Sequence, residues 1–187
     1  MINNFFNNRV GHQYAEKGVV AGVTGYCDVN YFNEGVLLSS QTIPGEWIEK
    51  EGKWWYKHND GSYTTNGWEK IKDKWYFFDS EGWMAYDWKK DGNTWYYLGE
   101  SQDGAMKTGW VLIDGKWYYF DENGGMVTGW IKLGDDWFFL KEDGAMATGW
   151  IEYEGDDYLL YSSGEMAHDC ELWGTYRFDS NGHATKI

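Results

Sequence analysis

Residues 109–130 read Gly109-Trp-Val-Leu-Ile-Asp-Gly-Lys-Trp-Tyr-Tyr-Phe-Asp-Glu-Asn-Gly-Gly-Met-Val-Thr-Gly-Trp130, so the stretch ends on the same Gly-Trp pair with which it begins. A short apolar run leads to Asp114-Gly115, and an aromatic run follows. Asp-Gly between two such runs is a strong β-hairpin signal, because both residues tolerate the positive φ of a tight turn. A second Gly turn and a Met follow before the pattern restarts. The stretch therefore predicts one hairpin and one linking turn.

The same pattern recurs along most of the chain at intervals of about twenty residues, which is the signature of stacked repeats. The Gly-Trp position is occupied by Trp47, Trp68, Trp88, Trp110, Trp130 and Trp150. The aromatic that follows the hairpin turn is Trp54, Trp75, Trp95, Trp117, Trp137 or Tyr158. A degenerate last copy has Cys170, Tyr176 and Ala184 in the slots of the two tryptophans and the Met, and we interpret it as a cap. We predict an all-β solenoid of β-hairpins with about six to seven repeats over residues 46–187.

The first part of the chain does not share the repeat. Residues 1–40 contain a few short strand-like stretches and are too few to bury a core alone. We therefore expect residues 1–40 to be either an N-terminal extension or the C-terminal remnant of a catalytic domain. Residues 41–45 include the single Pro of the chain and are expected to be a linker.

Composition excludes several classes of function. The net charge of −14 disfavours nucleic acid, since binding a polyanion requires clustered Lys and Arg, and no apolar run is long enough to span a membrane. An acidic surface suits a cationic ligand, although solubility alone would also explain the acidity. The chain shows no metal-ligand spacing, nucleophile elbow or phosphate loop, and its repeated acids offer no single carboxylate pair for glycoside hydrolysis. We expect no catalytic residue, metal site or cofactor in this chain.

Tryptophan is more abundant than a solenoid core requires. The chain has 14 Trp, whereas Leu, Ile and Val fill most solenoid cores and Trp leaves an N–H that needs a partner. About half of the aromatics are explained by core packing, and the methionines that follow each second turn fit the same role. Two Trp on opposite arms of a hairpin, with a third aromatic from the next hairpin, would form a three-walled box. Such boxes bind quaternary ammonium by cation–π attraction.

The quoted stretch resembles the choline-binding (cell-wall-binding) repeats of phage lysins and Gram-positive surface proteins. This resemblance implies choline sites between consecutive hairpins. Each site would use the Gly-Trp tryptophan and the second tryptophan of one repeat, together with the aromatic two places after the second Trp of the next repeat. Carried over to this sequence, the sets are Trp47, Trp54 and Phe77; Trp68, Trp75 and Tyr97; Trp88, Trp95 and Tyr119; and Trp110, Trp117 and Phe139.

Two later sites depart from the family pattern. Trp130 and Trp137 meet Leu160 where the resemblance implies a third aromatic wall. In the following copy Tyr158 takes the place of the second Trp, and a one-residue insertion is expected before it.

Residues 10–34 also resemble the closing strands of the family 25 muramidases, which are glycoside hydrolases that often carry these repeats. Together the two resemblances imply a non-enzymatic module that anchors a peptidoglycan hydrolase (endolysin) to choline or phosphocholine of teichoic acids. They imply an extracellular, cell-wall-associated protein that is delivered without a signal peptide or is a fragment of a secreted one. A homo-oligomer, formed with itself or with a full-length lysin, is left open. The alternative function is a glucan- or glycan-binding repeat array.

Overall fold

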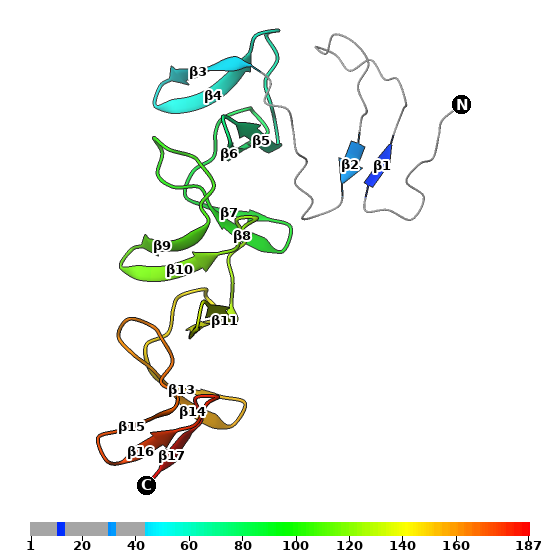
Figure 1. Ribbon diagram of the computed structural model, residues 1–187. Coiled ribbons are helices and arrows are strands. Elements are labelled where there is room, and N and C mark those ends of the chain that lie inside the picture. Colours follow the sequence, from blue (N-terminus) through cyan, green and yellow to red (C-terminus); the bar gives the residue numbers. More distant parts are fainter. Residues whose placement is uncertain (1–10, 14–29, 33–43) are drawn as a thin grey trace. The chain divides into compact units, whose positions relative to one another are not determined.

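The computed structural model describes residues 11–13, 30–32 and 44–187, and these residues form strands and turns (Figure 1). Within these ranges there is no helix, and so none with the length and apolar character needed to cross a membrane. The remaining residues include most of the segment that resembles a muramidase. The predicted division into residues 1–40 and a linker at 41–45 therefore stays a prediction.

Antiparallel strand pairs make up the fold. A short pair joins β1 (Gly11–Gln13) and β2 (Asn30–Phe32). From Gly45 onward, each repeat contributes one hairpin. The hairpins are β3 (Gly45–Lys50) with β4 (Lys53–His58), β5 (Gly67–Ile71) with β6 (Lys74–Phe78), β7 (Trp88–Asp91) with β8 (Thr94–Tyr97), β9 (Gly109–Ile113) with β10 (Lys116–Phe120), β11 (Gly129–Leu133) with β12 (Asp136–Leu140), and β13 (Gly149–Tyr153) with β14 (Asp156–Leu160).

The last repeat is a three-stranded sheet of β15 (Cys170–Leu172), β16 (Tyr176–Phe178) and β17 (Ala184–Lys186). The predicted all-β hairpin-repeat fold is thus confirmed. The chain divides into two compact units, of which the first ends at Lys107 and the second begins at Thr108. The first unit contains β1 to β8, and the second contains β9 to β17.

The hairpin turns follow directly from their sequence. In β9–β10, Ile113 pairs with Lys116, and the two turn residues Asp114 and Gly115 have φ values of 49° and 77°. Positive φ at both central positions defines the turn whose twist matches that of the flanking strands, and Asp-Gly adopts it at low cost. The loop length fixes the strand register, and the register decides which face each aromatic occupies.

Alternate residues of a strand point to opposite faces, and this gives every hairpin two different surfaces. In the five hairpins from β3–β4 to β11–β12, one surface carries the two tryptophans of the repeat. The other carries the buried residues that make up the core, such as Phe120, Leu140 and Leu160, which are each at most 1% exposed. These core residues form isolated bridges with the methionines of their linking segments, as in the Leu140–Met146 pair.

The linking segment after one hairpin binds the backbone of the hairpin before it. The Met146 N–H donates to the carbonyl oxygen of Trp117 at 2.7 Å, and the Met166 N–H donates to that of Trp137 at 2.8 Å. In the first unit, the Met84 N–H donates to the Trp54 oxygen at 2.6 Å. Because the acceptor in each of these bonds is the second Trp of a repeat, the bonds fix the spacing of the hairpins that they join and place a Met beside that Trp.

A buried polar cluster adds a link between the first two hairpins. His58 of β4 and Glu69 of β5 are 4% and 6% exposed, and their Nε2 and Oε1 atoms lie 2.9 Å apart. His58 Nδ1 lies 2.7 Å from the Ser62 hydroxyl, and Thr64 donates to the other carboxylate oxygen of Glu69. Every polar atom of this His–Glu pair therefore has a partner, as buried polar groups require.

The glycine of the second turn packs against the preceding methionine. A Cβ at Gly144 would lie 2.3 Å from the Met126 sulfur, and Gly104, Gly164 and Gly182 have the same relation to Met84, Met146 and Met166. Gly144 also has a φ of 82°, which L side chains rarely adopt. The repeat therefore needs Gly here both for its conformation and for its lack of a side chain.

We predict that Gly144→Ala destabilises the protein more than Gly129→Ala. Both glycines have a φ of 82°, but a Cβ at Gly129 meets nothing within 4 Å. The difference isolates the collision with Met126 and should be about 1–3 kcal/mol, typical of overpacking. Urea unfolding of the two variants measures this difference, and equal midpoints would show that the Met–Gly contact does not constrain the stack.

Candidate ligand-binding site

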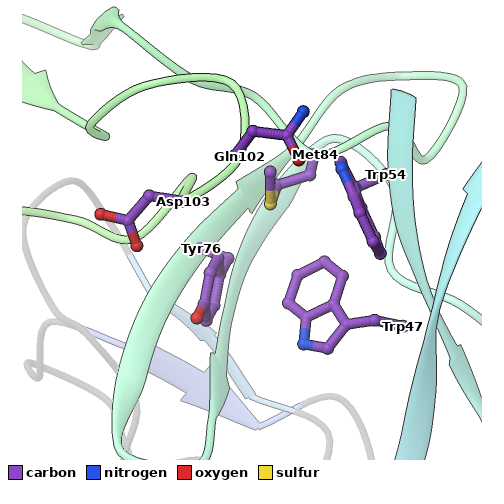
Figure 2. Close-up of a pocket in the computed structure, with 6 residues that line it drawn as sticks. All are labelled: Trp47, Trp54, Tyr76, Met84, Gln102 and Asp103. Carbon is purple, nitrogen blue, oxygen red and sulfur yellow. The ribbon is translucent and has the colours of Figure 1, made fainter. Parts of the chain in front are cut away.

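A cavity of about 260 Å³ lies between the first two hairpins, and we call it the Trp47 box. Figure 2 shows its lining residues, which are Trp47, Trp54, Tyr76, Met84, Gln102 and Asp103. Trp47 and Trp54 come from β3 and β4, whereas Tyr76 comes from β6. The ring centroids of Trp47 and Tyr76 are 4.9 Å apart at an interplanar angle of 64°. The box thus takes two walls from one hairpin and one from the next.

The second unit contains two boxes of the same design, each about 330 Å³ in volume. The Trp110 box is lined by Trp110, Trp117, Phe138, Met146, Ser163 and Glu165. The Trp130 box is lined by Trp130, Trp137, Tyr158, Met166, Ser180, Asn181 and His183. Two indoles, a third ring and a thioether therefore recur in each.

The aromatic walls stand nearly perpendicular to one another. In the Trp110 box the two indole centroids are 6.5 Å apart at 89°, and Phe138 lies 5.1 Å from Trp110 at 65°. The two tryptophans are diagonal neighbours across the hairpin, because Trp110 pairs with Tyr119 and Trp117 pairs with Leu112. Trp117 is 43% exposed, so one wall of the box remains accessible.

Two of the methionines belong both to the core and to a cavity wall. Met84 and Met166 are only 7% and 5% exposed, so they belong to the core, and each also lines a cavity. The sequence favoured core packing for these residues, and the backbone bonds from each Met to the preceding Trp explain why both roles coincide. A thioether suits this position because it is apolar and polarizable.

The electrostatic character of the boxes favours a cation. A carboxylate lines two of them, contributed by Asp103, which also pairs with the Lys107 ammonium, and by Glu165. In the Trp130 box the rim residue is His183, whose ring nitrogens lie 3.3 Å and 3.9 Å from the carboxylates of Asp179 and Asp156. Aromatic π faces attract cations, and the acidic chain reinforces that attraction.

The tyrosine walls stay neutral at neutral pH. Burial, followed by the nearby Asp103 carboxylate, raises the pKa of Tyr76 above its ordinary value. Burial raises the pKa of Tyr158 in the same way, with a further contribution from Asp156. A neutral phenol keeps its ring available as a π face. No group of three or more metal-ligating side chains occurs within the part of the chain that the structure describes.

The indole N–H groups differ in whether they have a hydrogen-bond partner. Trp68 Nε1 donates to Asp91 at 2.8 Å, whereas Trp54 Nε1 is buried and has no hydrogen-bond partner among the described residues. Leaving such a donor unpaired costs about 1–3 kcal/mol. The Trp54 ring is therefore positioned by packing rather than by a hydrogen bond.

Known proteins resemble this chain in sequence and fold. A family model described as "Choline-binding repeat" matches residues 65–107, 101–128, 107–147 and 127–170, which together span more than half of the chain. The chain belongs to the choline-binding repeat family. No curated protein matches it.

Solved structures of choline-binding proteins resemble the chain. Choline-binding protein F from Streptococcus pneumoniae is 38% identical, with a TM-score of 0.71 over 76% of this chain and 48% of that one. CbpJ from Streptococcus pneumoniae is 34% identical, with a TM-score of 0.71 over 91% and 53%. The pneumococcal cell wall endolysin from phage Cp-1, solved with choline, is 38% identical, with a TM-score of 0.50 over 78% and 44%. The chain therefore spans about half the length of each of these structures.

In the structure, the third aromatic wall of a box is the residue one place before the one that was predicted from the sequence. Tyr76 rather than Phe77 faces Trp47, and Phe138 rather than Phe139 faces Trp110. Phe77 and Phe139 instead pair with the first Trp of their own hairpins, Trp68 and Trp130, at 5.3 Å and 5.1 Å. The reason is strand alternation, since a residue two places after the second Trp shares its face and cannot point toward the preceding hairpin.

The same shift applies to the second predicted set. Trp68 lies 4.8 Å from Tyr96, whereas the predicted Tyr97 lies 5.3 Å from Trp88 of its own hairpin. In the third predicted set, the rings of Trp88 and Trp95 are 6.3 Å apart at 88° in the first unit. Tyr119 lies in the second unit, 5.2 Å from Trp110, so the set of Trp88, Trp95 and Tyr119 stays a prediction.

The expected insertion before Tyr158 is wrong. Gly149 pairs with Leu160 as Gly129 pairs with Leu140, so the two hairpins have the same register and length. The slot of the second Trp is held by Asp157, which pairs with Glu152. Tyr158 is instead the third wall of the Trp130 box, 4.9 Å from Trp130, and Leu160 is buried in the core. The sequence contained this signal, because the spacing from Trp130 to Trp137 leads from Trp150 to Asp157 rather than to Tyr158.

We predict that Phe138→Leu weakens tetramethylammonium binding at the Trp110 box and that Phe139→Leu does not. Loss of one ring removes about 0.5–2 kcal/mol of cation–π attraction, or about 2- to 30-fold in affinity. Fluorine NMR of the fluorotryptophan-labelled chain, with the Trp110 resonance assigned through Trp110→Phe, measures the effect at this box alone. A larger loss of affinity in Phe139→Leu than in Phe138→Leu would instead support Phe139 as the third wall, as predicted from the sequence.

Proposed function

We propose that the protein binds choline in the boxes between consecutive hairpins and thereby attaches to choline-bearing polymers of the cell wall. The observation that carries this proposal is the Trp110 box, in which two perpendicular indoles, Phe138 and Met146 surround a cavity with Glu165 at its rim. A trimethylammonium group needs π faces and an apolar floor and requires no hydrogen bond, and this is what the box provides.

The energetics fit a multivalent ligand. Three rings at about 0.5–2 kcal/mol each give a few kcal/mol, which corresponds to roughly millimolar affinity for a single box. A polymer that carries many choline groups engages several boxes at once and binds far more tightly than free choline does. Weak sites and repetition along the chain therefore support the same role.

We further propose that the polymer is a wall or lipid-linked teichoic acid that carries choline or phosphocholine, and that the repeats target a peptidoglycan hydrolase to it outside the cell. The similar protein from phage Cp-1, whose structure was solved with choline, is a multimodular cell wall endolysin by name. Within this proposal the described repeats bind and do not catalyse, and pairing of the chain with itself or with a full-length lysin is an additional proposal.

The alternative is that the boxes bind a glucan or another glycan. A sugar carries hydroxyl groups that need hydrogen-bond partners, whereas the walls of the Trp110 box are two indoles, a phenyl ring and a thioether. That lining favours the ammonium.

The test is a pair of titrations of the full chain by calorimetry, one with choline and one with 3,3-dimethyl-1-butanol, which has the same shape but no charge. Choline should bind in the millimolar range and raise the melting temperature, while the uncharged analogue should bind at least tenfold more weakly, since cation–π attraction supplies most of the affinity. Equal binding of the two compounds, or none of either, contradicts the proposal.

Asp157→Trp should add one choline site. In the β13–β14 hairpin the first Trp is Trp150, and its third wall is Tyr176 at a centroid distance of 4.8 Å, but Asp157 takes the slot of the second Trp. The expectation that Tyr176 holds a second-Trp slot is wrong, because Cys170 pairs with Phe178 as Gly149 pairs with Leu160, and this register makes Tyr176 equivalent to Tyr158. Calorimetric stoichiometry should rise by one site. The control is Asp156→Trp, which places the new ring on the opposite face and should add none.

A further inference from the structure

We propose that the first unit contains a second kind of site, which binds a hexopyranose ring. The site is a cavity of about 240 Å³, which we call the Trp83 groove, and its lining includes Lys53, Trp54, Asp79, Trp83, Tyr86 and Ser101. Trp54 and Met84 line both this groove and the Trp47 box, so the two cavities adjoin. Sugar binding in the groove does not depend on choline binding in the boxes.

The groove exists because one linking segment departs from the repeat. The residue before the Met is Trp83 here, and it is Ala105, Gly125, Ala145 or Glu165 in later copies. The residue two places after the Met is Tyr86 here, and it is Thr108, Thr128, Thr148 or His168 in later copies. Both departures are aromatic, and both side chains line the same cavity.

The hairpin stack does not require these two rings. Tyr86 is 53% exposed, and the equivalent turns of later copies form without Trp or Tyr in the same slots. The Asp79 carboxylate accepts hydrogen bonds from the N–H groups of Glu81 and Trp83, both at 2.9 Å, and so holds Trp83 in place. Asp121 accepts the equivalent hydrogen bond from the N–H of Gly125. The turn at Trp83 therefore has the backbone structure of a later copy, and only its aromatic side chain differs.

The groove has the chemistry of a sugar site. Its aromatic side chains provide flat apolar surfaces against which the C–H face of a pyranose ring can pack. Asp79, Lys53 and Ser101 bring a carboxylate, an ammonium and a hydroxyl to the same cavity, and such groups hydrogen-bond to ring hydroxyls. Small-ligand sites generally combine aromatic walls with a few polar groups in this way.

A second choline is the wrong ligand for this groove. The Lys53 ammonium already lies over the Trp83 ring, 5.5 Å from its centroid. This lysine makes the cation–π contact that a choline would need, and its positive charge opposes a second cation. In the adjoining Trp47 box no lysine belongs to the lining, and the Lys107 ammonium is paired with the Asp103 carboxylate rather than placed over a ring of the box, so the two cavities select different parts of a ligand. If the boxes bind choline as proposed above, the groove is placed to take a sugar unit of the polymer that carries it.

The experiment titrates the fluorotryptophan-labelled full chain with two probes, tri-N-acetylchitotriose and cellotriose, and follows each tryptophan by fluorine NMR. The Trp83 resonance, assigned through Trp83→Phe, should shift and saturate with at least one sugar at millimolar concentration, while the Trp110 resonance stays in place. Tyr86→Ala should weaken this sugar binding at least fivefold. Tyr161→Ala is the matched control, since Tyr161 is also an exposed tyrosine, at 39%, and lies outside the groove; it should leave sugar binding unchanged.

Three results would overturn the inference: no Trp83 shift with either sugar at tens of millimolar, an equal shift of Trp110, or equal effects of Tyr86→Ala and Tyr161→Ala. Choline added to the same samples separates this proposal from the previous one. A choline response at Trp110 without a sugar response at Trp83 contradicts the sugar site in the groove and supports the choline boxes. A sugar response at Trp83 without a choline response at Trp110 supports the sugar site and contradicts the choline boxes.

Discussion

Each hairpin of this protein presents its aromatic side chains on two faces, because alternate residues of a β-strand point in opposite directions. One face can carry the two tryptophans of a box, and the other face can carry the third ring of the box that is formed with the preceding hairpin. In β12, Trp137 belongs to the Trp130 box while its neighbour Phe138 closes the Trp110 box. A single aromatic dipeptide thus serves two sites. The boxes exist only because consecutive hairpins stack at a fixed spacing.

That spacing depends on the linking segments as much as on the rings. The linker methionines Met84, Met146 and Met166 bond through their N–H groups to a tryptophan carbonyl of the preceding hairpin, and their sulfur atoms pack against a glycine of the following turn. Core stability and ligand binding are therefore carried by the same residues. A change in the packing of a methionine such as Met146 alters a cavity as well as the core, because its side chain belongs to both.

The repeats are alike in design but differ in chemistry at their edges. Asp103 and Glu165 place a carboxylate at two rims, whereas His183 stands at a third between Asp156 and Asp179. Trp83 and Tyr86 add an aromatic groove beside the first box, with Lys53 over one of its rings. Since the frame is constant, such differences fall on the loops and linkers, where they can diversify the ligand without changing the fold.

The sequence by itself determined the repeat, the hairpin turns and the two tryptophans of each box, because turn chemistry and a period of about twenty residues are local properties. Only the tertiary structure decided the third wall. Whether Phe138 or Phe139 meets Trp110 depends on which face of the next hairpin is turned toward it, and the linear pattern contains two adjacent aromatics. Likewise, the place of Tyr158 follows from strand pairing, in which Gly149 meets Leu160, rather than from its similarity to a missing tryptophan.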